Sequence, residues 1–180
     1  MVKLDGALNQ TTDNFVYQNG NIKVAEAFYI NGKTLIFTQV ANHVKFLQYS
    51  QDRGFICQFS QDKSTLLQIL PVVASNEQTF LALIKSQNSL TVNSFDADLR
   101  PVQSHDLPYS QKAIMLATDI GIEVLIDDNI IRYCPHLDFL AESEIDNPEL
   151  VQNATEYHTV SGAENFFIAK REKGFDLFKK

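Results

Sequence analysis

Tryptophan is absent from this chain of 180 residues, and only two cysteines are present, Cys57 and Cys134. Two cysteines cannot form a framework of several disulfides, and such usage is typical of a reducing compartment. No apolar run approaches the roughly 20 residues that a membrane-spanning helix needs. Asp5 and Asn9 interrupt the N-terminal segment where a secretory signal would have its apolar centre. We therefore expect an intracellular protein, cytoplasmic or nuclear, without membrane association.

Basic residues are also scarce. Lysine and arginine total 15 against 22 aspartates and glutamates, which gives a net charge of -7. Binding along a phosphate backbone requires a basic surface, so this balance argues against nucleic acid as a partner. The composition, 44% hydrophobic and 21% charged, is that of a globular protein. A chain of this length usually forms one domain with a substantial core.

Short apolar runs separated by polar turns fill most of the sequence. In the clearest case, the run Phe80 to Ile84 is followed by a polar turn and then by Leu90 to Phe95, where apolar and polar residues alternate. A period of two between turn residues predicts an antiparallel β-hairpin. Asn19-Gly20 and Asn31-Gly32 predict further hairpins, because both residues of an Asn-Gly pair tolerate positive φ. Together with 13 phenylalanines and six tyrosines, this pattern predicts an all-β fold of antiparallel hairpins.

The domain prediction is a polar lead-in over residues 1–14 and a single all-β domain over residues 15–180. Ala141 to Thr155 is the least strand-like part of this domain, and Pro148 to Ala154 fits a short helix that Asn147 would cap. Strands are expected elsewhere at residues 15–17, 22–27, 27–30, 34–40, 44–49, 55–59, 66–73, 80–84, 90–95, 99–108, 113–118, 122–126, 130–134, 137–140, 165–169 and 175–178.

Similar pairs of apolar strands recur along the chain. The second strands of these pairs start at residues 44, 90, 122 and 175, so the intervals are 46, 32 and 53 residues. One four-stranded propeller blade has a length of about 40 to 50 residues. The segment LTVNSFDADLRPVQSHDLP resembles the inner half of a blade of the WD40 family, and the resemblance extends over residues 27–180. It implies a partial or small β-propeller-like architecture.

The chain departs from that family in having neither a Trp-Asp nor a Gly-His pair, so no functional residue is transferred to it. The alternative fold is a β-sandwich or a barrel, in which hairpins recur for ordinary reasons of chain length.

Three metal-ligating residue types fall within five residues, at Cys134, His136 and Asp138. On a strand these positions would share one face. A closed zinc site needs about four ligands, and the sequence has no second pair at recognisable spacing. We therefore predict no metal and no cofactor, and we interpret Cys134 as a buried free cysteine that precedes a turn.

A hydroxyl, an imidazole and a carboxylate are adjacent at Ser104, His105 and Asp106. Neighbouring residues on a strand point to opposite faces, so these three cannot form a catalytic relay with one another. The sequence also has no glycine-rich phosphate loop and no nucleophile elbow. A catalytic site would have to bring together residues from separate segments, and the candidates are His105, His136 and Asp138.

The function expected from these features is that of a non-enzymatic protein–protein interaction module or a subunit of a larger assembly. The alternatives are a hydrolase built around the dispersed histidines and aspartate, or a β-sandwich that binds carbohydrate or another ligand on a concave, aromatic-lined face. The expected partner is another protein chain or a second copy of this one, because exposed sheet edges pair with other strands. The expected contact residues lie in the terminal hairpin, at Phe166, Phe167, Phe175 and Phe178.

Overall fold

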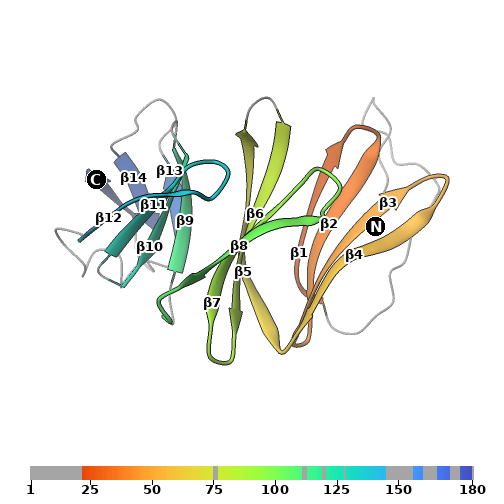
Figure 1. The fold of residues 1–180 in the computed structure, drawn as a ribbon, viewed down its shortest axis with the longest axis horizontal. Helices are drawn as coiled ribbons and strands as arrows, with labels where there is room; N and C mark the ends of the chain where they lie inside the picture. The colour runs from red at the N-terminus through yellow and green to blue at the C-terminus, as the bar shows by residue number, and fades with distance from the viewer. Residues whose placement is uncertain are drawn as a thin grey trace.

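The computed structural model describes residues 22–74, 77–110, 113–118, 121–127, 129–144, 156–159, 166–170 and 175–179. All regular structure in these residues is β, with fifteen strands in four antiparallel sheets (Figure 1). The all-β prediction is therefore confirmed. No helix in this part of the chain is long and apolar enough to cross a membrane.

Each sheet is a meander in which strands pair in chain order. Sheet 1 contains β1 (Ile22–Ile30), β2 (Lys33–Val40), β3 (His43–Ser50) and β4 (Gly54–Asp62). Sheet 2 contains β5 (Ser64–Ala74), β6 (Glu77–Ser86), β7 (Leu90–Phe95) and β8 (Pro101–Leu107). Sheet 3 contains β9 (Ala113–Thr118), β10 (Gly121–Ile126), β11 (Asn129–Tyr133) and β12 (Phe139–Glu144). The last sheet contains β13 (Glu156–Thr159), β14 (Phe166–Lys170) and β15 (Phe175–Lys179).

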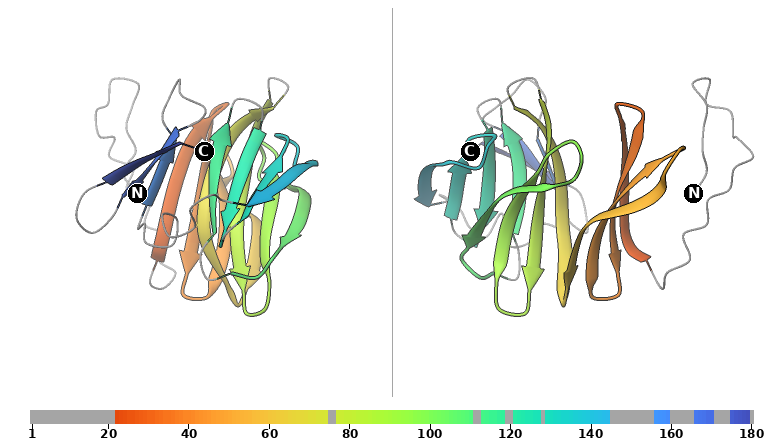
Figure 2. Two further views of the ribbon diagram at one scale, coloured as in Figure 1. Left: turned by 90° about the vertical axis from the view of Figure 1, so that its left-hand side faces the viewer. Right: turned by 45° about the vertical axis from the view of Figure 1, so that its right-hand side comes forward.

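Sheet 2 is buried on both faces, and strand β6 shows this most clearly. Side chains of adjacent strand residues point to opposite faces. Phe80, Ala82 and Ile84 pack into a core shared with sheet 1, whereas Leu81 and Leu83 pack into a second core shared with sheet 3. All five side chains are 0% exposed. The continuous apolar run that predicted a strand here is thus a strand covered on both sides, and sheet 2 lies between sheets 1 and 3 (Figures 1 and 2).

The core between sheets 1 and 2 is largely phenylalanine. The ring centroids of Phe37 and Phe46 are 4.8 Å apart, those of Phe46 and Phe95 are 4.9 Å apart, and those of Phe37 and Phe80 are 5.1 Å apart. Two of these three contacts are edge-on, the arrangement that the charge distribution of aromatic rings favours. Burying each such side chain contributes about 1.5–3 kcal/mol, so this cluster is a main source of stability.

Two glutamines join neighbouring sheets through the backbone. Gln68 Oε1 accepts the Met115 N–H at 2.8 Å, and Gln68 Nε2 donates to the Met115 carbonyl at 2.9 Å. Gln39 Oε1 accepts the Leu66 N–H at 3.1 Å, and its Nε2 donates to the Ala41 carbonyl at 3.0 Å. Leaving a buried donor or acceptor unpaired costs about 1–3 kcal/mol. The amides therefore fix β5 against β2, and β9 against β5.

The structure confirms most of the expected strands and corrects the sequence analysis in three places. The segment 22–30 is one strand, β1, where two were expected. Ala141 to Glu144 belongs to strand β12, because Glu142 and Glu144 alternate outward into solvent and their charges cost nothing there. Strand β13 was not predicted. The lead-in of residues 1–14, the strand at 15–17 and the helix at 148–154 lie outside the described residues.

The sheets also correct the phase of the repeat. In sheets 1 and 2 the paired strands recognised in the sequence are the second and third strands, whereas in sheet 3 they are the first and second, β9 and β10. The third strands of the four sheets begin at His43, Leu90, Asn129 and Phe175. Their intervals are 47, 39 and 46 residues, which is more regular than the spacing read from the sequence.

The terminal hairpin forms as predicted, with Phe167 opposite Phe178 and Lys170 opposite Phe175 in the β14–β15 ladder. Strand β13 lies beside β9 of sheet 3. The strand pairing does not test whether a partner binds this hairpin. Partner contact through Phe166, Phe167, Phe175 and Phe178 therefore stays a prediction.

Replacement of Gly121 by alanine tests how closely β10 approaches β11. Gly121 has a φ of +155°, and a Cβ there would lie 2.1 Å from the Tyr133 carbonyl oxygen. Because that oxygen belongs to the backbone, Gly121→Ala should lower the free energy of unfolding by more than about 2 kcal/mol. Urea denaturation followed by circular dichroism measures the loss. The control is Gly32→Ala, where φ is +77° but no atom lies within 4 Å. Equal losses for the two variants would contradict the close approach.

Candidate functional site

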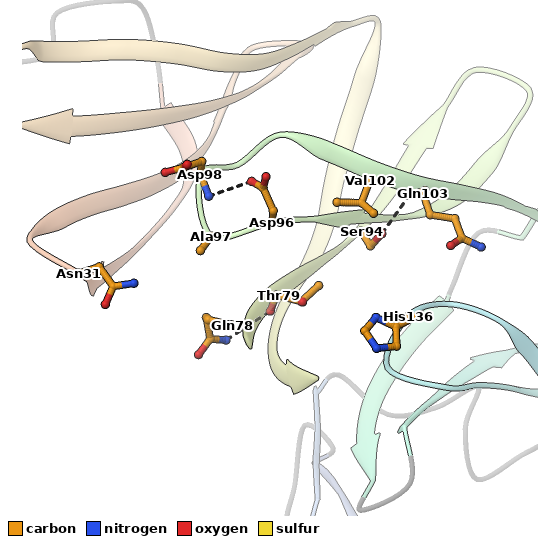
Figure 3. Close-up of a pocket in the computed structure, with 10 residues that line it drawn as sticks. All are labelled: Asn31, Gln78, Thr79, Ser94, Asp96, Ala97, Asp98, Val102, Gln103 and His136. Atoms are coloured by element: carbon orange, nitrogen blue, oxygen red, sulfur yellow. Dashed lines mark hydrogen bonds between the residues drawn. The ribbon is translucent and has the colours of Figure 1, made fainter. Parts of the chain in front are cut away.

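The turns that connect strands of three different sheets meet at one end of the molecule, which we call the turn end. It includes the β1–β2 turn at Asn31-Gly32, the β7–β8 loop at Asp96–Arg100 and the β11–β12 loop at Cys134–Asp138. Residues from all three turns line one cavity of about 470 Å³, which shows that the turns lie close together (Figure 3). Strands β6, β7 and β8 supply the other lining residues. The complete lining comprises Asn31, Gln78, Thr79, Ser94, Asp96, Ala97, Asp98, Val102, Gln103 and His136.

The β7–β8 loop is held by one carboxylate. Asp96 Oδ1 accepts the backbone N–H of Asp98 at 2.8 Å and that of Arg100 at 2.9 Å. The Asp96 N–H donates to the Arg100 carbonyl at 3.1 Å, and the Leu99 N–H donates to the Asp96 carbonyl at 3.0 Å. Leu99 has a φ of +63°, yet its side chain is 0% exposed. The loop is thus fixed at its base by Asp96 and anchored in the core by Leu99.

The β11–β12 loop repeats this structure 38 residues later in the chain. The Cys134 N–H donates to the Asp138 carbonyl at 2.9 Å, and the Leu137 N–H donates to the Cys134 carbonyl at 2.9 Å. Leu137 has a φ of +68° and is also 0% exposed. Cys134 occupies the position that Asp96 has in the β7–β8 loop, and its Sγ accepts the His136 N–H at 3.3 Å. A thiol is a weak acceptor, so the loop keeps its shape with weaker support.

The predicted catalytic residues do not meet in the cavity. His136 lines it, but neither Asp138 nor His105 belongs to the lining. His105 lies on β8, where its ring is 5.5 Å from that of Tyr133 and its Nε2 is 2.7 Å from Gln103 Nε2. In the described part of the chain, no group of three histidines, cysteines or acidic residues is arranged to hold a metal ion.

Local structure at His105 and at Cys134 is close to what the sequence predicts. Ser104 and Asp106 are exposed while His105 is half-buried, so neighbours on β8 point apart as expected. Cys134 is a free cysteine followed by a turn, as interpreted from the sequence, and residues 134–138 form a loop instead of a strand on which residues 134, 136 and 138 would share one face. In that loop Cys134 is free and partly exposed, and its thiol donates to Asp138 Oδ2 at 3.4 Å.

A salt bridge joins sheets 1 and 2 at the turn end. Lys33 Nζ lies 2.5 Å from Asp98 Oδ1, and the two side chains are 36% and 38% exposed. The hydrogen bond from Lys33 lowers the pKa of Asp98 from its usual value of 3.8. On the far side of this bridge lies a second hollow of about 450 Å³, whose charged lining residues include Lys33, Arg53 and Arg100. Asp98 lines both spaces, so the bridge marks the boundary between them.

Apolar side chains are exposed on the fourth strands of sheets 2 and 3, next to the cavity. Val102, which lines the cavity, is 67% exposed, while Phe139 and Leu140 on β12 are 58% and 51% exposed. The ring of Phe139 also contacts that of Tyr133, which in turn contacts His105 on β8. The strand registers shift at Val102 and at Leu140, which turns each side chain away from the regular alternation.

Most residues of this site were not predicted from the sequence. Its lining comes from turns and strand ends between Asn31 and His136, and only His136 had been singled out. The one available signal was the pair of five-residue loops with leucine in fourth position, at Leu99 and Leu137.

No family model matches this chain, and no curated protein matches it. Its function therefore has to be inferred from the chemistry and geometry of the turn end.

Substitutions of Asp96 separate its structural role from its charge. Asp96→Ala removes the acceptor for two backbone N–H groups and should lower the free energy of unfolding by about 1–2 kcal/mol. Asp96→Asn keeps an oxygen at the same place and should cost less than about 0.5 kcal/mol. Urea titrations of both variants provide the measurement. An asparagine variant as unstable as the alanine variant would show that the two hydrogen bonds do not hold the loop.

Lys33→Met tests the salt bridge through its pH dependence. Because the pKa of Asp98 is lower in the folded protein than in the unfolded chain, the bridge stabilises the fold above pH ~4 and this stabilisation is lost as the pH falls through the folded value. We expect a loss of less than about 1 kcal/mol at neutral pH, since the pair is partly exposed. The difference from the wild type should shrink in acid. Lys63→Met, at an exposed lysine, is the control, and a difference independent of pH would argue against the bridge.

Proposed function

We propose that this chain is a non-enzymatic protein-interaction module with propeller-like architecture, and that it binds a segment of a partner protein at the turn end. The observation that carries the proposal is the cavity into which turns from three separate sheets converge. Rigid sheets that present variable loops at one end are a common arrangement for binding sites.

Three features favour a propeller-like arrangement. The chain forms successive four-stranded meanders at intervals close to one blade length. The first strands of sheets 2 and 3 and of the last sheet lie side by side, with β5 against β9 and β9 against β13, as inner strands around a common axis would, while β5 contacts β2 and β3 of sheet 1. Sheet 2 is covered on both faces, whereas each sheet of a two-layer sandwich has one inner face. These features favour blades over a sandwich.

The lining of the cavity suits a peptide. Gln78 Nε2 already donates to the Val72 and Thr79 carbonyls, and Gln103 Nε2 lies 2.7 Å from His105 Nε2. Asn31 therefore carries an amide donor and acceptor, Gln78 and Gln103 add amide oxygens, and Thr79 and Ser94 add hydroxyl groups. Such groups match the alternating N–H and C=O groups of a polypeptide segment. The exposed apolar side chains on β8 and β12 would cover an apolar side chain of the same segment. Among the described residues no phenylalanine or tyrosine lines the cavity, so a carbohydrate would lack the large aromatic face expected of such a site.

The hydrolase alternative has less support. Its three candidate residues would have to act on one substrate, yet only His136 faces the cavity. A second copy of the chain remains an alternative occupant that the experiment below distinguishes.

Selection of peptides from a random displayed library on the immobilised protein tests the proposal. We expect the selected peptides to lose at least about tenfold in affinity for Val102→Lys, which replaces an apolar side chain at the rim of the cavity with a longer, positively charged one. Asn88→Lys, at an exposed turn on the opposite end, is the matched control and should bind as the wild type does. Failure to select any peptide, or equal losses in both variants, would contradict binding at the turn end.

Two further measurements address the alternatives. A dimer in light scattering that Val102→Lys dissociates would identify a second copy as the occupant, in place of a different protein. Hydrolysis of ester, phosphoester or glycoside substrates that His136→Ala abolishes would establish the hydrolase instead.

A further inference from the structure

The charges that face the cavity are mostly negative. Asp96 and Asp98 are its two carboxylates, and His136 is the one basic residue type among its lining residues. Lys33 bonds Asp98 from the side of the second hollow, and Arg100 also lines that hollow rather than the cavity. The lining therefore attracts a cation that enters the cavity.

The two carboxylate oxygens of Asp96 have different surroundings. Oδ1 accepts both backbone N–H groups of its own loop. In the described part of the chain no hydrogen bond reaches Oδ2, and the carboxylate belongs to the wall of the cavity (Figure 3). The loop thus holds the carboxylate in place before any ligand arrives, which reduces the entropy that a partner must lose in binding it.

The walls of the cavity suit a long cationic side chain. Lysine and arginine bury their aliphatic stems along apolar surface while their charged ends reach polar partners. Val102 provides an apolar wall on β8, and amide and hydroxyl groups surround the carboxylates. A volume of about 470 Å³ exceeds one side chain and leaves room for adjoining backbone.

We infer that the partner segment places an arginine or lysine side chain in this cavity, where Asp96 binds its charged end. The inference rests on the proposed function and names the chemistry of the partner. Lys33 acts as an internal competitor, because its ammonium group already occupies the second carboxylate, Asp98. Asp96 and Lys33 should therefore affect the affinity in opposite directions.

Fluorescence anisotropy with labelled nonapeptide sublibraries, each with one fixed central residue, tests the inference. Sublibraries with central arginine or lysine should bind about fivefold tighter than the one with glutamine. Asp96→Asn, which keeps the loop's acceptor, should abolish this preference. Lys33→Met should strengthen binding of the basic sublibraries about threefold, since it frees Asp98. Asp106→Asn, an exposed carboxylate on β8, is the control and should leave the preference unchanged.

The outcomes distinguish failure of this inference from failure of the proposed function. Equal binding of the glutamine and arginine sublibraries, or a preference that survives Asp96→Asn, overturns the cationic ligand. If that binding is still lost in Val102→Lys, the interaction module stands and only its specificity is wrong. If no sublibrary binds at the turn end, the proposed function fails as well. Weakening of the basic sublibraries by added salt, without an equal effect on the glutamine sublibrary, supports the ion pair.

Discussion

Burial of sheet 2 on both faces is the constraint on which the other parts of the structure depend. In β6, Phe80 and Ile84 lie against sheet 1 while Leu81 and Leu83 lie against sheet 3, and none of them is exposed. A shift of one residue in this strand would exchange the two cores. The phenylalanine-rich side and the aliphatic side are not interchangeable, so β6 determines which sheet packs where. Only with sheets 1 and 3 so placed do their turns reach a common cavity.

The two equivalent loops connect this core to the site. Leu99 and Leu137 adopt positive φ, which costs roughly 1–2 kcal/mol for a residue with a side chain. Each leucine is fully buried, and burial of such a side chain contributes about 1.5–3 kcal/mol. The cost of the positive φ and the gain from burial nearly offset each other, so the loop conformation is retained while its remaining positions stay partly or fully exposed. Asp98 and His136 occupy the same position in the two loops, and both line the cavity.

Local pattern was sufficient to predict the strands but not the site. The apolar alternation of β6 and β7 reflects their own burial, so it could be read from the sequence. Strand β12 was partly missed because an edge strand carries glutamates on its solvent side, and these resemble a loop. In sheet 3 the repeat was assigned one strand too early, since β9 and β10 are as apolar as the hairpins of the other sheets. The cavity depends on contacts between turns as far apart as Asn31 and His136, which no local pattern encodes.

The lining of the cavity also explains why residue types alone did not predict this site. Histidine and cysteine attract attention as catalytic or metal-binding residues, whereas an aspartate in a turn is expected for structural reasons. Asp96 fulfils that structural role with one oxygen and leaves the other at the cavity wall. In the equivalent position Cys134 supports its loop without adding a carboxylate to the lining. The repeated loop therefore gives the cavity an asymmetric charge, with the acid on sheet 2 and the imidazole of His136 on sheet 3. In the proposed complex, the positive charge of the partner segment would lie toward sheet 2.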